Sequence, residues 1–146
     1  MVTDTRPTAP LWQPPDVEWL RPYRDGLSER ELRLPRCSEC AQWCWYPLTD
    51  RSPCHHATYL WEHVGATATL FSFTRVQRSL IPGHTEPYVV GLVLPEYAPR
   101  CRVAAVIADG VHLRCDAALE LRFTRSDETS DTGPAPYPYY RLRGAR

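Results

Sequence analysis

The chain has 146 residues, of which 43% are hydrophobic, and this suits one domain or a small module joined to a larger one. Its 17 basic and 17 acidic residues give a formal net charge of zero. That balance argues against a general nucleic-acid or membrane-surface binder, because such proteins carry an excess of basic residues. Every basic residue is arginine, so lysine-based chemistry such as Schiff-base formation is excluded.

The first part of the chain predicts one helix and one short strand. Residues 1–15 are rich in proline and threonine and predict a flexible arm without regular structure. Apolar residues recur over 16–27 and predict a short helical region, in which Pro22 is tolerated at a first turn. Residues 31–34 alternate between polar and apolar and predict a strand that leads toward Cys37.

The second part changes to strand-like segments separated by turns. They occupy 59–64, 67–78, 88–94, 101–108, 118–124 and 139–143. The run at 88–94 is apolar on both faces, as expected for a barrel wall, and Gly91 within it suggests a bulge or a sharp bend. Asp109 and Gly110 form a hairpin signal after 101–108.

About five strands of uneven length, one of them strongly bent, suit a small Greek-key barrel of OB type. We therefore expect a mainly β protein, in which an N-terminal helix and a rubredoxin-like zinc ribbon precede an OB-fold five-stranded β-barrel. The predicted parts are 1–15 for the flexible arm, 16–60 for the helix and ribbon, and 61–146 for the barrel with a C-terminal tail.

The chain contains six cysteines: Cys37, Cys40, Cys44, Cys54, Cys101 and Cys115. Residues 1–10 contain no apolar segment of the kind found in signal peptides, and no run approaches the roughly 20 apolar residues of a membrane span. We therefore expect a cytoplasmic protein with reduced cysteines, the paired ones serving as metal ligands. Cys101 and Cys115 lie in apolar sequence and are expected to be buried free thiols.

The C-x-x-C pair of Cys37 and Cys40, followed by Cys54 with His56 nearby, is a zinc-ribbon pattern. Each of two tight turns must point two ligands at one position to complete a tetrahedron. Ala57 stands where a four-cysteine ribbon would have its last ligand. We expect a structural zinc held by Cys37, Cys40, Cys54 and His56, since an imidazole is longer than a thiolate and can reach the metal from one residue earlier.

Other arrangements of this site stay open. His55 or Cys44 could supply the fourth ligand. Alternatively the site has lost its metal, and the aromatic residues at 43–46 hold the ribbon in shape. A redox pair of Cys37 and Cys40 is disfavoured, because the pair follows a strand and does not open a helix that would lower a thiol pKa.

The order of these parts resembles the zinc-ribbon/OB-fold family of acyl-CoA-associated proteins catalogued as domain of unknown function family thirty-five. The resemblance spans residues 16–143, and its matching segments are Pro22–Leu27, Glu31–Cys40, Leu70–Thr74 and Pro87–Leu92. Two features depart from the family pattern: Ala57 replaces a cysteine, and 113–117 lacks the glycine that usually precedes the last main barrel strand.

The resemblance implies an accessory role. Members of the family are partners of thiolase-fold enzymes such as thiolases, ketoacyl synthases and steroid side-chain aldolases, and some occur with hydratases. It implies that the chain binds its enzyme through ribbon and barrel, helps to form an acyl-CoA channel in some cases, and is not itself catalytic.

Candidate ligand-binding residues outside the cysteine cluster are few. Arg75 and Arg78 end the longest predicted strand and could meet CoA phosphates, since arginine forks suit phosphate; a solvated strand end is the plainer interpretation. We therefore expect a non-catalytic subunit of an acyl-CoA-processing enzyme in lipid or polyketide metabolism, with no nucleic acid or membrane as partner. Two alternatives stay open: a single-stranded nucleic-acid-binding OB-fold protein, and a small stand-alone enzyme that uses the Cys/His cluster.

Overall fold

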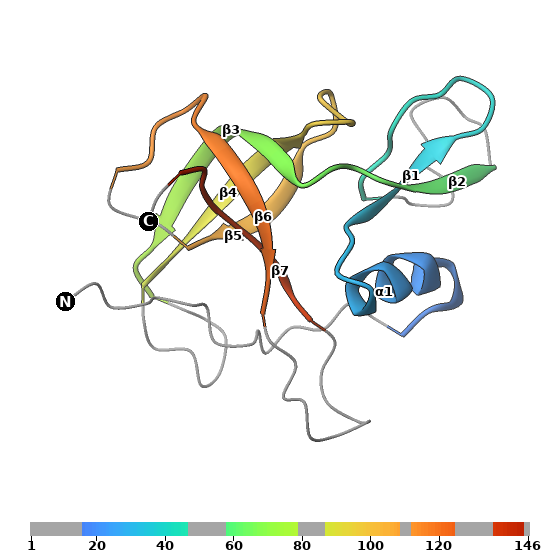
Figure 1. The fold of residues 1–146 in the computed structure, drawn as a ribbon, viewed down its shortest axis with the longest axis horizontal. Helices are drawn as coiled ribbons and strands as arrows, with labels where there is room; N and C mark the ends of the chain where they lie inside the picture. Colours follow the sequence, from blue (N-terminus) through green and yellow to red (C-terminus); the bar gives the residue numbers. More distant parts are fainter. Residues whose placement is uncertain (1–15, 47–57, 79–86, 109–111, 125–135, 145–146) are drawn as a thin grey trace.

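The computed structural model describes residues 16–46, 58–78, 87–108, 112–124 and 136–144. Within these ranges it shows a mainly β protein with one short helical region, a small two-stranded sheet and a barrel beside them (Figure 1). The elements are η1 (Glu18–Leu20), α1 (Arg21–Ser28), β1 (Arg33–Cys37), β2 (Tyr59–His63), β3 (Thr67–Val76), β4 (Tyr88–Pro95), β5 (Val103–Ile107), β6 (Ala118–Phe123) and β7 (Pro138–Leu142). The predicted arm, residues 1–15, lies outside the described residues.

The helix forms where the apolar spacing predicts it. Leu20, Tyr23 and Leu27 are buried at spacings of three and four residues, so they share one face. Pro22 stands in the first turn, where its missing N–H is tolerated. An eight-residue helix is too short to be stable alone, so its stability comes from this face packing into the shared core.

The small sheet pairs β1 with β2 in antiparallel register from Arg33 opposite His63 to Cys37 opposite Tyr59. A bridge between Arg36 and Trp43 extends it on the other side of β1. We call η1, α1 and this sheet, residues 16–63 as far as they are described, the ribbon module. The aromatic residues predicted to cover it do so in part: Trp43 and Trp45 pack against the core, and the Trp45 ring stacks on Tyr23 with 5.0 Å between centres.

The barrel is closed, with the strand order β3-β4-β5-β7-β6. Numbered within the barrel this is 1-2-3-5-4, the order of an OB fold, and the predicted mainly β fold with an N-terminal helix and a five-stranded barrel is confirmed. The β5–β7 pair is parallel and every other barrel pair is antiparallel. Asp109 and Gly110, which suggested a hairpin, lie outside the described residues; the strand before them, β5, pairs with β4 and β7 and not with the next strand, β6.

Alternate side chains of the strands fill the barrel. On β4 the odd-numbered positions are buried and the even-numbered ones are half-buried. The prediction of a bulge or a sharp bend at Gly91 is wrong. The bulge lies on the neighbouring strand, β3, between Leu70 and Ser72. Gly91 instead faces inward, where a Cβ atom would lie 2.8 Å from Leu70 Cδ1 and 3.0 Å from Ile107 Cγ1. It therefore serves close packing and not a bend.

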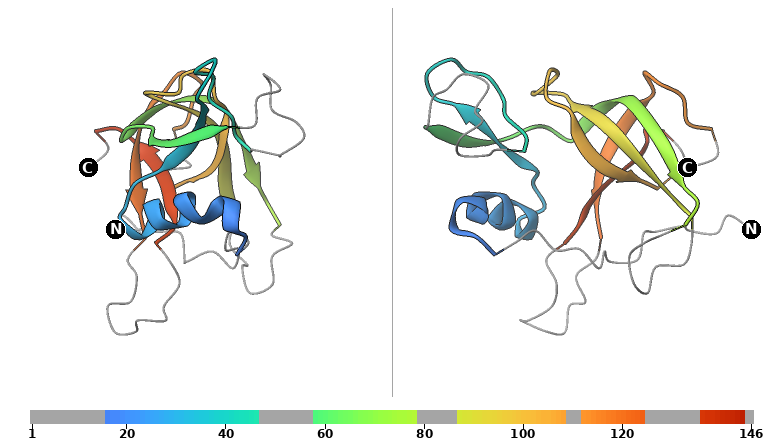
Figure 2. Two further views of the ribbon diagram at one scale, coloured as in Figure 1. Left: turned by 90° about the vertical axis from the view of Figure 1, so that its right-hand side faces the viewer. Right: turned by 180° about the vertical axis from the view of Figure 1, so that it is seen from behind.

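The ribbon module and the barrel share one core. Val64, on the connection between β2 and β3, is fully buried and donates its N–H to Leu32 O at 3.0 Å. Its own carbonyl accepts from Tyr97 N–H at 3.2 Å, so one residue bonds to both parts. The view from behind in Figure 2 shows the two parts side by side, as in Figure 1. Among the described residues no helix is long and apolar enough to cross a membrane.

Candidate functional site

The turn after β1 has the geometry of a metal-binding knuckle. Cys37 ends the strand with its side chain buried, and Cys40 is exposed three residues later. The Cys40 N–H points at Cys37 Sγ, 3.5 Å away, and Ala41 takes a left-handed conformation with φ of 60°. A backbone N–H directed at sulfur favours the thiolate, which is the form that binds metal. The turn thus suits a metal-binding cysteine pair.

The chain that returns from the predicted second knuckle passes beside this turn. Ser38 N–H donates to Thr58 O at 3.1 Å, and the Ser38 hydroxyl donates to the same oxygen at 3.2 Å. Cys54 is four residues before Thr58, and four residues span at most about 14 Å. The sequence separation therefore lets Cys54 and its neighbours reach Cys37 and Cys40.

Only some of the predicted metal ligands lie among the residues that the structure describes. Cys54, His55, His56 and Ala57 lie outside the described residues, so the full ligand set stays a prediction. The described residues alone contain no group of three or more His, Cys, Asp or Glu side chains placed to hold a metal ion. The described residues supply one knuckle, from Cys37 to Cys40, in which the Cys40 N–H points at the Cys37 sulfur.

The remaining described cysteines fall in different environments. Cys44 is buried opposite Pro35, whose carbonyl accepts its N–H at 2.9 Å. Cys101 is buried as predicted, and burial, followed by the nearby charge of Cys44, raises its pKa to about 11. Cys115 is exposed, so the prediction of burial is wrong there. It lies in the turn ahead of β6, outside any strand, where apolar flanking sequence does not imply a core position.

A groove that the sequence did not predict runs between the ribbon module and the barrel. It consists of two cavities of about 500 and 560 Å³ that share Glu31, His63 and Tyr97. Trp43 and Trp61 line one end, while Leu121 and Phe123 line the other. The His63 and Tyr97 rings meet edge to face with 5.4 Å between centres. No local pattern signals this groove, because its walls come from segments far apart in the sequence.

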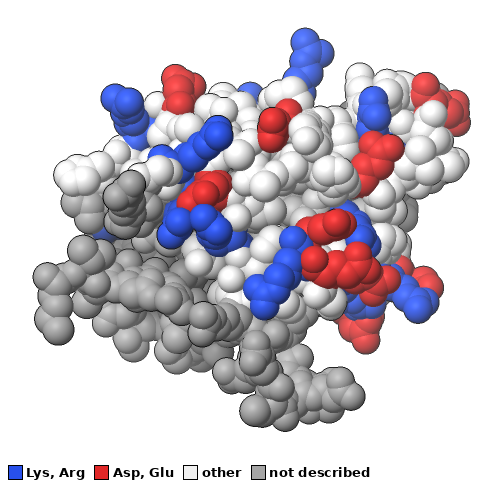
Figure 3. Space-filling model, in the orientation of Figure 1, with Lys and Arg blue, Asp and Glu red and all other residues white. Residues whose placement is uncertain are grey.

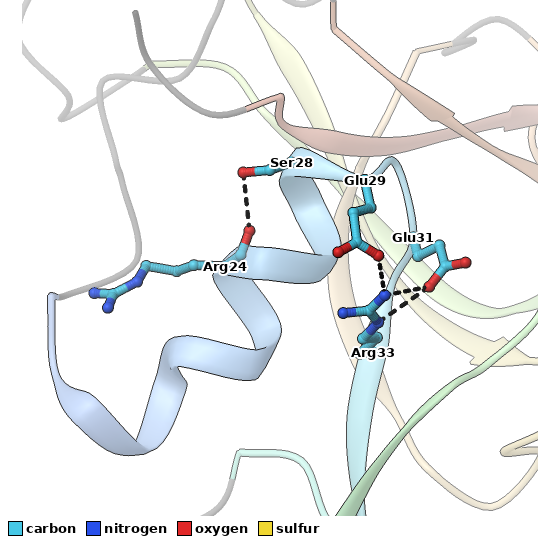
Figure 4. Close-up of polar contacts among 5 residues, drawn as sticks. All are labelled: Arg24, Ser28, Glu29, Glu31 and Arg33. Atoms are coloured by element: carbon cyan, nitrogen blue, oxygen red, sulfur yellow. Dashed lines mark hydrogen bonds and ion pairs between the residues drawn. The ribbon is translucent and has the colours of Figure 1, made fainter. Parts of the chain in front are cut away.

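The charges around the groove are balanced by internal ion pairs. Arg33 bonds to Glu31 at 2.8 Å and to Glu29, and so ties the end of α1 to β1 (Figure 4). Arg36 lies over the Trp43 ring, 5.6 Å from its centre, and pairs with Glu62 at 3.4 Å. At the Trp43 end the lining charges are therefore held in ion pairs, and at the other end the lining adds Arg30 and Arg122.

The predicted CoA-contact residues lie elsewhere. Arg75 is exposed near the end of β3, and Arg78 is exposed in the bend that follows. Eight residues of strand, about 26 Å, separate Arg75 from Thr67, where the chain leaves the ribbon module. The structure therefore does not bring these arginines together with the cysteine turn or the groove. On the face drawn in Figure 3, arginines and acidic side chains are interspersed, without a basic stripe.

The fold and the site define a class: a small ribbon module with a cysteine turn, built onto a five-stranded barrel of OB topology. No family model matches the sequence, and no curated protein matches it. Among solved structures, a chain of the "Ltp2-ChsH2(DUF35) aldolase" is similar over 88% of this chain and 98% of its own length, with a TM-score of 0.68. The two sequences are 17% identical, and this likeness establishes a shared fold.

Proposed function

We propose that this chain is a non-catalytic accessory subunit that binds a thiolase-fold enzyme acting on acyl-CoA and helps to form its acyl-CoA channel. The observation that carries the proposal is the likeness of fold, over nearly the whole of both chains, to a chain of an aldolase whose name includes DUF35. The segments Pro22–Leu27, Glu31–Cys40, Leu70–Thr74 and Pro87–Leu92, which resemble the same family, support it independently.

The arrangement of the molecule suits such a role. The ribbon module and the barrel share one core, so the chain presents their surfaces in a fixed relation to a partner. Large aromatic side chains stay exposed on both parts, among them Trp19 and Tyr46 on the ribbon module and Phe71 and Phe73 on the barrel. Exposed aromatic residues of this size are enriched at protein interfaces.

We further propose that Cys37, Cys40, Cys54 and His56 hold a structural zinc. Tetrahedral coordination by three thiolates and one imidazole would stabilise the ribbon module and supply no reactive position. The metal content of the purified chain, measured by mass spectrometry, tests this with an expected value of about one zinc per chain. Cys54→Ser and His56→Ala should lose the metal, while Cys115→Ser should keep it; a zinc-free chain purified in the presence of zinc would contradict the site.

Arg75 and Arg78 are the residues we assign to CoA phosphates within the complex. Both are exposed, and a guanidinium fork matches phosphate geometry. Replacing both by glutamine should raise the KM for acyl-CoA of the assembled enzyme about tenfold with little change in kcat. An unchanged KM would remove this assignment and leave the accessory role intact.

Co-purification tests the accessory role itself. The tagged chain is recovered from its source, its partners are identified, and the identified partner is expressed with and without the chain. We expect a thiolase-fold subunit in fixed stoichiometry, no acyl-CoA turnover by the isolated chain, and lower activity or solubility of the partner alone. A chain that stays monomeric without such a partner, or that binds oligonucleotides in a salt-dependent manner, would contradict the proposal.

A further inference from the structure

The outer surface of the barrel differs between its two sides. Cross-strand neighbours point to the same side of a sheet. Because Val89, Gly91 and Val93 are buried inside, Val90, Leu92 and Leu94 point outward. Figure 1 shows β6 and β7 in front of the barrel, and the view from behind in Figure 2 shows β4 and β5 nearest the viewer.

On the β4–β5 side the outward positions form an apolar surface. Val90 lies opposite Val106, and Leu92 lies opposite Ala104, so their side chains adjoin across the two strands. On β3 the bulge turns Phe71 outward, where it is 41% exposed. We call this surface the outer β3–β5 face, made of Phe71, Val90, Leu92, Leu94, Ala104 and Val106 together with the uncharged Ser72 and Thr74.

The outward side chains of β6 and β7 include charged groups that pair with one another. Glu120 accepts hydrogen bonds from Arg122 at 2.9 Å and from Arg141 at 2.5 Å. These arginines lower the pKa of Glu120, Arg122 first and Arg141 second, and so keep it ionised. A strand face whose charges pair with one another is typical of a surface that stays in water.

An arginine borders the outer β3–β5 face. Arg102 comes directly before β5, and its guanidinium reaches across β4 to lie over the Phe71 ring, 4.3 Å from the ring centre. Within the described residues Arg102 has no carboxylate partner, unlike Arg33, Arg36, Arg122 and Arg141. If this face were covered without a partner for Arg102, the guanidinium would lose its water without compensation. An occupant must therefore bring a carboxylate.

We propose that the outer β3–β5 face is the docking surface for a different protein, which offers an apolar strip with an Asp or Glu placed to meet Arg102. A second copy fits poorly, because the described residues of this face contain no carboxylate to offer. Three strands at 4.8 Å spacing and about five residues along each give roughly 250 Å² of sheet, about a third of an interface of about 800 Å² per partner. That the occupant is the enzyme subunit rests on the proposed function.

A site-specific cross-link identifies the occupant. A photoreactive phenylalanine derivative is placed at position 92, and as a matched control at position 60, where Leu60 is exposed on the ribbon module. We expect position 92 to cross-link to another protein through a peptide that contains apolar residues and an Asp or Glu. A cross-link to a second copy, to residues 1–15 of the same chain, or from position 60 alone would overturn the proposal.

Affinity measurements with the cross-linked partner then test the chemistry. Arg102→Glu should weaken binding about tenfold, and replacing the partner carboxylate by arginine should restore it. Leu92→Glu should weaken binding about a hundredfold, whereas Leu60→Glu, at an exposed position of the ribbon module, should leave it unchanged. The circular dichroism spectrum and Tm of each variant show that the barrel is folded, and Arg102→Glu changes no core residue.

The two proposals can fail separately. If a thiolase-fold subunit binds and the Arg102 and Leu92 variants bind it as well as the unmodified chain does, this face is not the interface, while the accessory role stands. If position 92 cross-links with the expected charge exchange to a protein of another class, the face stands and the accessory role falls. If neither position cross-links, the docking surface is wrong.

Discussion

The barrel and the ribbon module are stabilised in different ways. Five strands close on themselves, so the barrel has no free sheet edge and encloses fully buried side chains such as Leu70, Val93 and Leu119. The ribbon module has a two-stranded sheet and an eight-residue helix, neither of which is stable alone in water. It depends on the barrel, on its aromatic residues and, in our proposal, on a metal.

The two parts also carry different optical signals. All five tryptophans precede residue 62, so none lies in the barrel strands. Four of the five tryptophans belong to the ribbon module, so tryptophan fluorescence reports mainly on that part, while far-ultraviolet circular dichroism is dominated by the barrel. The ribbon module has little core of its own. It need not unfold separately from the barrel, because Val64 forms hydrogen bonds to both parts.

The largest effect is expected from a barrel leucine. Leu119→Ala removes a fully buried side chain and should lower the free energy of unfolding by about 2–5 kcal/mol. Leu60→Ala, the matched change on the ribbon module, removes a side chain that is 54% exposed and should cost less than about 0.5 kcal/mol. Denaturant unfolding followed by both signals checks this pair; equal costs would contradict the comparison.

An overpacking variant should act on the barrel with a smaller effect. Gly91→Val places new atoms against Leu70 and Ile107, both of which line the barrel interior, and should cost about 1–3 kcal/mol. Gly144→Ala is a poor control, because Gly144 has φ of 80°, so Ala104→Val at an exposed position of β5 serves instead. A Gly91→Val chain as stable as the unmodified one would show that the interior can rearrange. Coincident loss of both signals would show that the ribbon module follows the barrel.

The barrel was easier to predict from the sequence than the site. The barrel strands β3 and β4 are rich in β-branched and aromatic residues, and on β6 the period-two pattern of 118–124 buries Leu119 while Ala118 and Arg122 stay exposed. The pattern of Asp109 and Gly110 did not predict the strand pairing correctly, because a turn pattern is local and does not determine which strands become neighbours in a sheet. The order 1-2-3-5-4 depends on contacts between distant segments, such as the parallel pairing of Ile107 with Tyr140.

Only the part of the site that is formed by residues close together in the sequence could be predicted. The C-x-x-C spacing implied the turn from Cys37 to Cys40, since four consecutive residues define such a turn. The groove was missed because Trp43, Trp61 and Tyr97 come from three separate segments. Arg102 was missed for the same reason: its partner, Phe71, lies two strands away.

Two tyrosines with buried hydroxyl groups, one in each part, allow a direct comparison. Tyr140 in the barrel and Tyr59 in the ribbon module have buried hydroxyls without a hydrogen-bond partner in the described structure. Burial, followed by the nearby Tyr23, also raises the pKa of Tyr140. Because an unpaired buried hydroxyl is unfavourable, Tyr140→Phe and Tyr59→Phe should each be neutral or stabilising by up to about 1 kcal/mol. Thermal unfolding checks this, and a loss of more than about 1 kcal/mol would reveal a hydrogen bond made in solution.

The smallest effect is expected from Glu120, on the charged side of the barrel. Arg122 and Arg141 lower its pKa in the folded chain, so its contribution to stability is full above the unfolded pKa of about 4.3 and is lost as pH falls through the lowered folded pKa.

Glu120→Gln should therefore cost a few tenths to about 1 kcal/mol at pH 7, and its stability should fall less steeply below pH 4. The Tm measured between pH 2 and 7 gives both quantities. Combining it with Arg141→Gln separates that pair from the one with Arg122. If the acid limb were the same with and without Glu120, the ion pairs would contribute nothing to the folded state, and the charged side of the barrel would owe its stability to the same apolar packing as the side we assign to docking.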